Sequence, residues 1–220
     1  MNEDALTFLV LIGSQARGDA NIRSDVDALV VGSPPTDLIE TLRGSFNEPL
    51  SLVSYSQTDF LRLFEAGSLF LHHCFDEGIL WSGHEQSWRS LGKRFVVQKD
   101  FSSEIGKCIS TCRLILKPEI FGGHYLAPFV NAYTQLKNAS IFFLAQRQIY
   151  RFNKDQAIRE AAALLRFCDS ETITSLRDIY DYSVRGLDLP LPFPLDSVIH
   201  GNRVLRIASD YMKRISDACC

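Results

Sequence analysis

Two aspartates separated by one residue stand at the start of an apolar run. Asp25 and Asp27 flank Val26 in the segment 25–31, which reads DVDALVV. Because successive side chains of a strand point to opposite faces, both carboxylates are expected on one face. Two carboxylates this close repel each other unless they share a cation. The spacing therefore predicts a divalent metal site with Asp25 and Asp27 as its ligands.

A second polar element, Gly13-Ser14, directly follows an apolar run over residues 6–12 (LTFLVLI). Proteins usually hold Mg²⁺ by one or two carboxylates together with substrate phosphates. The two aspartates therefore predict a phosphate-bearing substrate. A glycine lets the backbone approach an anion closely, Ser14 adds a hydroxyl, and Arg17 adds a guanidinium fork. Together these residues predict a site for Mg²⁺ and a nucleoside triphosphate.

The spacing of these elements matches a known pattern. Gly13-Ser14, ten intervening residues and then Asp25-Val26-Asp27 lie between apolar runs, in the form GSQARG…SDVDALVVG. This resembles the signature of the polymerase-beta-like nucleotidyltransferase superfamily, in its minimal and antibiotic nucleotidyltransferase branches. The resemblance covers roughly residues 6–83. It implies a catalytic and metal-binding role for Asp25 and Asp27, and nucleotide contacts for Gly13, Ser14, Arg17 and Ser24.

The resemblance also implies a reaction. Enzymes of this superfamily transfer a nucleoside monophosphate from a triphosphate to an acceptor and release pyrophosphate, with Mg²⁺ at the phosphates. For this chain we expect AMP from ATP, or a nucleotide from another triphosphate. The acceptor would be a hydroxyl on a small molecule or on a partner protein. Either one or two Mg²⁺ ions fit this scheme.

One position departs from the family pattern. The third carboxylate of the superfamily normally lies on the next strand, at a position matching Ser51. Serine is neither a base nor an anionic metal ligand. Glu48 is the nearest acid, and a solvated charge before Pro49 is the simpler interpretation of it. Two functions therefore stay open. One is an active transferase, and the other is a degenerate one that binds a nucleotide or a protein partner, like an antitoxin.

The first part of the chain supplies elements that would position this site. Apolar runs and stop signals predict four strands and three helices. Ser56 is expected to cap the second helix, and the segment 13–24 is expected to be a loop. The predicted strands are 6–12, 25–31, 49–55 and 79–81, and the predicted helices are 36–46, 57–66 and 69–77.

From about residue 86 onward the pattern is helical. The resulting fold class is α/β (α+β), a small mixed-sheet nucleotidyltransferase domain over 1–90 followed by an α-helical C-terminal domain over 91–220. The helical domain is expected to form the other wall of the substrate cleft and to select the acceptor. Its predicted helices, together with one that precedes the boundary, are 86–93, 102–116, 127–150, 154–168, 171–183 and 195–216.

The amino-acid composition limits which other classes of protein the chain could belong to. The 220 residues are 46% hydrophobic, which is enough for one large or two small cores. Net charge is −3, with −6 in residues 1–98 and +3 in residues 99–220. Neither part is basic enough for a general nucleic-acid binder, so a nucleic-acid partner is not expected.

Cellular location is inferred from what the sequence lacks. There is no run of about 18 apolar residues, so no membrane span is expected. The start, MNEDALTF, lacks the basic residues of a signal peptide. The six cysteines contain no C-x-x-C pair and are expected to be reduced, with Cys108 and Cys112 buried in a helix. A cytoplasmic location is the resulting prediction.

Overall fold

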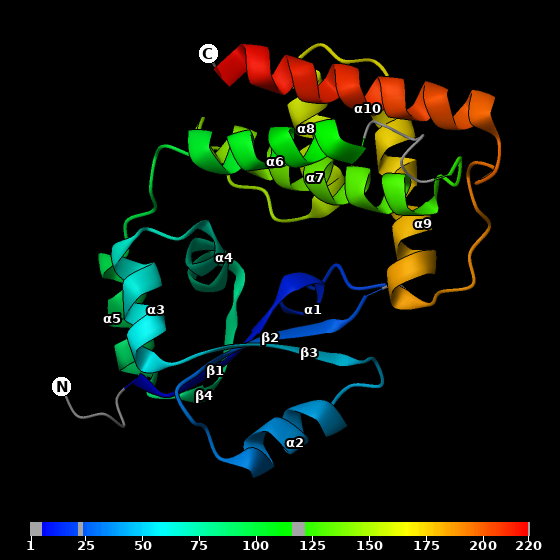
Figure 1. The fold of residues 1–220 in the computed structure, drawn as a ribbon. Coiled ribbons are helices and arrows are strands. Elements are labelled where there is room, and N and C mark those ends of the chain that lie inside the picture. The colour runs from blue at the N-terminus through cyan, green and yellow to red at the C-terminus, as the bar shows by residue number, and fades with distance from the viewer. Residues whose placement is uncertain (1–5, 22–23, 116–121, 220) are drawn as a thin grey trace. The chain divides into compact units, whose positions relative to one another are not determined.

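The chain divides into two compact units, Met1–Gln98 and Lys99–Cys220. They are seen in a computed structural model, in which residues 6–21, 24–115 and 122–219 are described (Figure 1). The first unit combines a sheet with helices, and the second is helical. The predicted α+β fold class is therefore confirmed.

A four-stranded sheet in the order β3-β2-β1-β4 organises the first unit. Strands β2 and β3 run parallel, whereas β1 is antiparallel to both β2 and β4, so the sheet is mixed. All four strands lie where the apolar runs predict them. They are β1 (Phe8–Ile12), β2 (Val26–Val31), β3 (Leu50–Tyr55) and β4 (Ile79–Gly83).

Helices cover both faces of this sheet. The parallel pair β2–β3 requires a crossover connection, which α2 provides. Ser56 caps α3, and its Oγ accepts a hydrogen bond from the Asp59 N–H at 3.1 Å, as the sequence predicts. The helices of the unit are α1 (Gly13–Arg17), α2 (Thr36–Gly44), α3 (Gln57–Glu65), α4 (Leu69–Glu77) and α5 (Glu85–Arg94).

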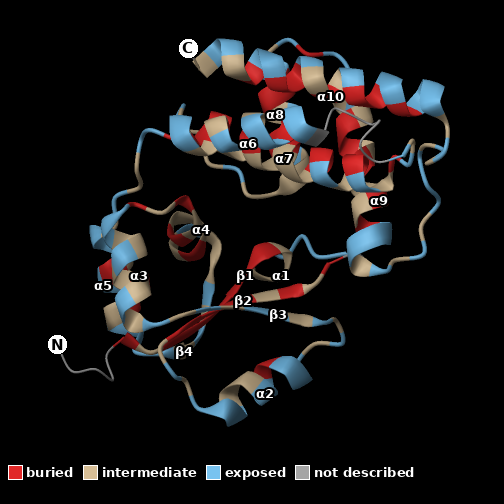
Figure 2. Ribbon diagram, in the orientation of Figure 1, coloured by how far each residue is buried: buried red, intermediate tan, exposed pale blue. Residues whose placement is uncertain are grey.

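Strand β2 is buried on both faces, which explains its nearly continuous apolar sequence (Figure 2). Val26, Ala28 and Val30 pack in one core with Leu42 of α2. The alternate residues Leu29 and Val31 pack in a second core, which also takes in Phe60 of α3, Leu71 of α4 and Trp88 of α5. Position 27 therefore belongs to the face that α3, α4 and α5 cover.

The segment 13–24 is not wholly a loop, so this expectation was wrong. Its first five residues form α1, which ends at Gly18 in the left-handed conformation, with φ of 74°. The Gly18 N–H donates to the carbonyls of Ser14 and Gln15, which closes the short helix. Five residues are too few to show a helical repeat of apolar side chains, so the pattern gave no signal here.

The edge strand β4 is irregular. Leu9 of β1 lies opposite Ser82, whereas the next residue, Val10, lies opposite Leu80. Trp81 is thus an extra residue on β4, as in a β-bulge. Its ring contacts Phe46 with a centroid distance of 6.4 Å. The bulge bends this edge of the sheet and leaves β3 as the regular edge strand.

Among the described residues of the second unit, α7 is the central helix, and α6, α8, α9 and α10 pack against it. Each predicted helix is present, but α7 ends at Ala145 rather than at 150, and α8 ends at Leu164 rather than at 168. Cys108 and Cys112 are buried, as predicted. The helices are α6 (Ser102–Ile115), α7 (Leu126–Ala145), α8 (Lys154–Leu164), α9 (Ser170–Arg185) and α10 (Val198–Cys219).

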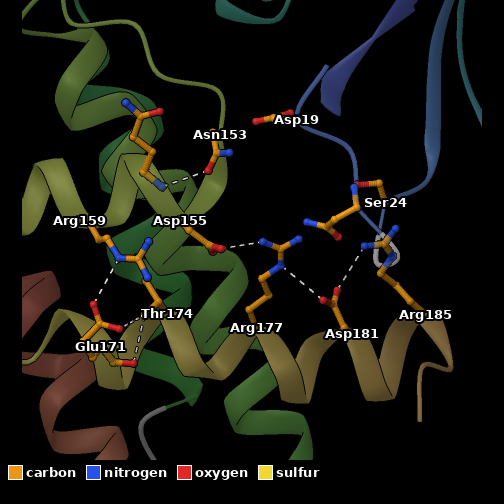
Figure 3. Close-up of polar contacts among 12 residues, drawn as sticks. Asp19, Ser24, Asn153, Asp155, Arg159, Glu171, Thr174, Arg177, Asp181 and Arg185 are labelled. Atoms are coloured by element: carbon orange, nitrogen blue, oxygen red, sulfur yellow. Dashed lines mark hydrogen bonds and ion pairs between the residues drawn. The ribbon is translucent and has the colours of Figure 1, made fainter. Parts of the chain in front are cut away.

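Polar contacts tie the helices of this unit together. Arg177 of α9 reaches Asp155 of α8 at 2.6 Å and Asp181 of its own helix at 3.4 Å (Figure 3). The buried hydroxyls of Ser140 in α7 and Tyr211 in α10 lie 2.8 Å apart. These bonds join α9 to α8 and α10 to α7. Over the described residues, none of the helices is both long and apolar enough to cross a membrane.

Candidate functional site

The two aspartates of the motif lie at the start of β2. Asp27 is the second residue of the strand, opposite Ile12 on β1 and Ser51 on β3. Asp25 comes directly before the strand. Both aspartates are half-buried, whereas Val26 between them is buried. This alternation places both carboxylates on the same side of β2, as the sequence predicts.

Gly13 lies directly against one of these carboxylates. Its φ is +74°, and a Cβ added to it would lie 3.0 Å from Oδ2 of Asp27. A side chain at position 13 would thus be strained by the backbone and would crowd Asp27. The glycine brings the start of α1 next to the aspartate, with Ser14 as the following residue of the helix. The structure therefore brings the two halves of the motif together.

Ser24 closes the turn that leads into β2. Its Oγ accepts a hydrogen bond from the Asn21 N–H at 2.9 Å. Its own N–H donates to the Asn21 carbonyl at 2.8 Å. Ser24 as a whole is only 9% exposed. In this arrangement Ser24 holds the chain immediately before Asp25.

Arg17, the last residue of α1, is held by two carboxylates. Its Nη1 lies 3.0 Å from Oε2 of Glu77. On its other side, Nη2 lies 3.2 Å from Oδ1 of Asp19 and Nε lies 3.3 Å from Oδ2. Burial disfavours the charged guanidinium, but the bonds to Glu77 and Asp19 outweigh burial and raise the pKa of Arg17. The residue predicted to contact phosphate thus already has anionic oxygens as partners.

Glu77 is shared with a histidine from its own helix. His73 Nε2 lies 3.1 Å from Glu77 Oε2, one helical turn away. Burial alone would raise the pKa of Glu77, but hydrogen bonds from His73 and Arg17 lower it below its usual value. The sequence interpretation gave neither residue a part in the site. The available signal was the spacing of four residues, which brings two side chains together on a helix.

Ser51 lies beside one of the two aspartates of the motif. It is paired in register with Asp27 on the adjacent parallel strand, and its side chain is exposed. Glu48 lies three residues earlier, in a bend before β3. The backbone between them is anchored, because the Val26 N–H donates to the Pro49 carbonyl at 3.0 Å. A hydroxyl thus occupies the strand position next to Asp27.

Asp25 and Asp27 would suit Mg²⁺ only if a substrate supplied the remaining ligands. Among residues 6–21, 24–115 and 122–219 there is no group of three or more histidine, cysteine, aspartate or glutamate side chains that fits a metal ion. Two neighbouring carboxylates, Asp25 and Asp27, match the usual protein share of a Mg²⁺ site whose other ligands are phosphate oxygens and water. This donor set predicts metal binding that depends on nucleotide.

A protein-family model matches the first part of the chain. Residues 2–70 fit the family model for the nucleotidyltransferase domain. The match includes Gly13-Ser14, both aspartates and Ser51, and confirms the recognised resemblance for this part of the chain. The sequence matches none of the curated proteins.

Solved structures that are similar to the chain at low sequence identity include three from different proteins. Spectinomycin adenyltransferase AAD(9) from Enterococcus faecialis, solved with ATP and spectinomycin, is 14% identical, with a TM-score of 0.46 over 96% of this chain and 93% of that one. A toxin–antitoxin structure with AMP-PNP is 18% identical, with a TM-score of 0.28 over 41% of this chain and 71% of that one. A nucleotidyltransferase-like protein from Exiguobacterium sibiricum 255-15 is 13% identical, with a TM-score of 0.31 over 97% and 69%.

Proposed function

We propose that the nucleotidyltransferase domain matched in residues 2–70 transfers AMP from ATP to a hydroxyl and releases pyrophosphate. The observation that carries the proposal is the contact between Gly13 and Asp27. The backbone of Gly13, which has no side chain, lies against the carboxylate of Asp27. A second carboxylate, that of Asp25, is two residues away in the sequence. This combination fits a triphosphate bound through Mg²⁺, because it offers both anionic ligands and space for phosphate oxygens.

In the proposed reaction the acceptor oxygen attacks the α-phosphorus. A new P–O bond forms, the bond from the α-phosphorus to the oxygen bridging it to the β-phosphorus breaks, and pyrophosphate leaves. The hydroxyl proton passes to a base or to water. Asp25 and Asp27 would hold Mg²⁺, which on binding neutralises the charge that develops on the phosphates. Gly13, Ser14 and Arg17 would orient the β- and γ-phosphates.

The test is pyrophosphate release with Mg²⁺, ATP and a panel of hydroxyl-bearing acceptors, including aminocyclitols and Tyr- or Ser-containing peptides. Wild-type protein is expected to release pyrophosphate with at least one acceptor, and Asp27→Asn is expected not to. Asp37→Asn, an exposed change on α2, is the matched control for loss of one negative charge. Equal release by wild type and Asp27→Asn would contradict the proposal.

A second function is favoured by the hydroxyl of Ser51 beside Asp27. Without a third carboxylate, the acceptor hydroxyl lacks its usual base, and the domain would bind a nucleotide, or a partner protein in the manner of an antitoxin, without turnover. The two functions differ in one measurement. A binder retains Mg²⁺-dependent affinity for ATP in calorimetry but releases no pyrophosphate with any acceptor.

A further inference from the structure

The contacts of Arg17 are of two different kinds. Asp19 meets the guanidinium side-on, with one oxygen 3.3 Å from Nε and the other 3.2 Å from Nη2. Glu77 meets it through a single oxygen, 3.0 Å from Nη1. A paired contact by two oxygens is also the way in which an arginine binds a phosphate. The carboxylate of Asp19 thus occupies donors of Arg17 that suit a phosphate group.

The two carboxylates also differ in their surroundings. The side chain of Glu77 is 21% exposed and has a second partner in His73, whose Nε2 lies 3.1 Å from Glu77 Oε2. The side chain of Asp19 is 39% exposed. It follows Gly18, whose left-handed φ of 74° turns the chain at the end of α1. Glu77 is therefore a fixed partner from α4, whereas Asp19 lies on an exposed turn.

We propose that Asp19 competes with a nucleotide phosphate for Arg17, and that Glu77 is a positioning residue that holds the guanidinium for either of them. This inference rests on the proposed nucleotide site. In the nucleotide-free protein, Asp19 neutralises Arg17. When the nucleotide binds, its phosphate replaces the Asp19 carboxylate at Nε and Nη2, while Glu77 keeps its bond to Nη1. Asp19 is thus a built-in competitor that lowers affinity for the substrate.

The proposal predicts opposite effects for the two carboxylates. Asp19→Asn removes the competing charge, so MgATP should bind about two- to fivefold more tightly, as expected for a partly exposed ion pair. Glu77→Gln releases the guanidinium, so MgATP should bind about tenfold more weakly. A general effect of negative charge on an anionic ligand would instead change both affinities in the same direction.

The experiment is calorimetry of the full chain with MgATP, with folding checked by circular dichroism. Matched controls are Asp59→Asn and Glu85→Gln, because both residues pair with an arginine on their own helices in the same unit. Neither control should change the affinity. Each variant is also made in an Arg17→Gln background, where both effects should disappear if they act through Arg17. Glu77→Asp, which keeps the charge, should recover part of the lost affinity.

Three results would overturn the proposal. If Asp19→Asn binds MgATP no more tightly than wild type, Asp19 does not compete with the phosphate. Nucleotide binding by wild type would still support the proposed function. Effects that persist in the Arg17→Gln background show that Asp19 and Glu77 act elsewhere. If neither wild type nor Asp19→Asn binds MgATP, the nucleotide site is wrong and both proposals fall together.

Discussion

Asp27 and Ser51 are directly paired in the parallel strands β2 and β3, with Asp27 half-buried and Ser51 exposed at the sheet edge. In a parallel pair, residues in register point to the same face. A carboxylate placed at position 51 would therefore stand beside the aspartate that is proposed to bind the metal. The exposed edge also means that this exchange requires no rearrangement of the core.

Ser51→Asp is therefore expected to increase Mg²⁺-dependent pyrophosphate release. General-base catalysis is typically worth about 10²–10⁴ in rate, which sets the upper range of the gain. The measurement is the initial rate with the best acceptor. Ser54→Asp is the control, because it is exposed on the same strand but has the opposite parity. If Ser51→Asp adds nothing and Glu48→Gln abolishes release, Glu48 is the base.

The metal site itself is tested by nucleotide binding with and without Mg²⁺. Asp25→Asn should bind ATP equally in both conditions, because it removes one of the two carboxylates that would bridge the metal to the phosphates. Wild type should bind more tightly with Mg²⁺. Calorimetry gives both values. A Mg²⁺ effect of the same size in Asp25→Asn and wild type would rule out the metal assignment.

Substitution of Gly13 can separate the effect of backbone strain on stability from the effect of a side chain on nucleotide binding. Gly13→Ala should cost about 1–2 kcal/mol in the free energy of unfolding, because its φ of +74° disfavours a side chain. It should also abolish MgATP binding, since the new Cβ would lie 3.0 Å from Asp27 Oδ2. Gly18→Ala is the matched control, with the same φ of +74° and, apart from its chain neighbours, no atom of the described residues within 4 Å of its Cβ. It should lose stability but still bind. Normal binding by Gly13→Ala would show that the glycine only makes a turn.

Lys137 in α7 gives a prediction for the helical unit. Burial, assisted by the charge of Lys154, lowers the pKa of Lys137 to about 8. The ammonium lies 5.9 Å and 5.7 Å from the ring centroids of Tyr133 and Tyr180. A lowered pKa means that the charged form destabilises the fold, and that stability rises as pH increases from about 8 towards the ordinary value near 10.5.

Lys137→Met should therefore be more stable than wild type at pH 7, by about 2 kcal/mol. The advantage should shrink as pH rises through 8 to 10, since wild-type Lys137 then loses its charge. Denaturant unfolding at several pH values measures the difference, with the exposed Lys107→Met as control. A pH-independent advantage would show that the methionine stabilises by packing alone.

The sequence predicted most of the sheet and the motif because their signals are local. Strand β2 is a nearly continuous apolar run, and Gly13, Asp25 and Asp27 are close together in the chain. The end of α7 was harder to place, because the residues after Ala145 include neither glycine nor proline. Gln148 nevertheless adopts a left-handed φ of 60°. The Ile149 N–H donates to the Leu144 carbonyl at 3.0 Å and closes the helix there.

The partners of Arg17 could not be predicted for a different reason. Glu77 lies sixty residues further along the chain, and only the packing of α4 beside α1 brings the two together. A family motif identifies the arginine but contains no information on which carboxylates surround it. The residues that would tune nucleotide affinity are thus determined by tertiary structure, whereas those that would bind the metal are visible in the motif.

The bulge at Trp81 has a consequence for association between molecules. An edge strand exposes backbone N–H and C=O groups that can pair with a strand of another molecule. A bulge interrupts the regular spacing that such pairing needs. Within the described residues, β4 pairs only with β1, and Trp81 breaks its register. This side of the sheet is therefore expected to resist cross-β pairing with other molecules at high concentration. A variant that deletes Trp81 to restore regular pairing is expected to lose that protection.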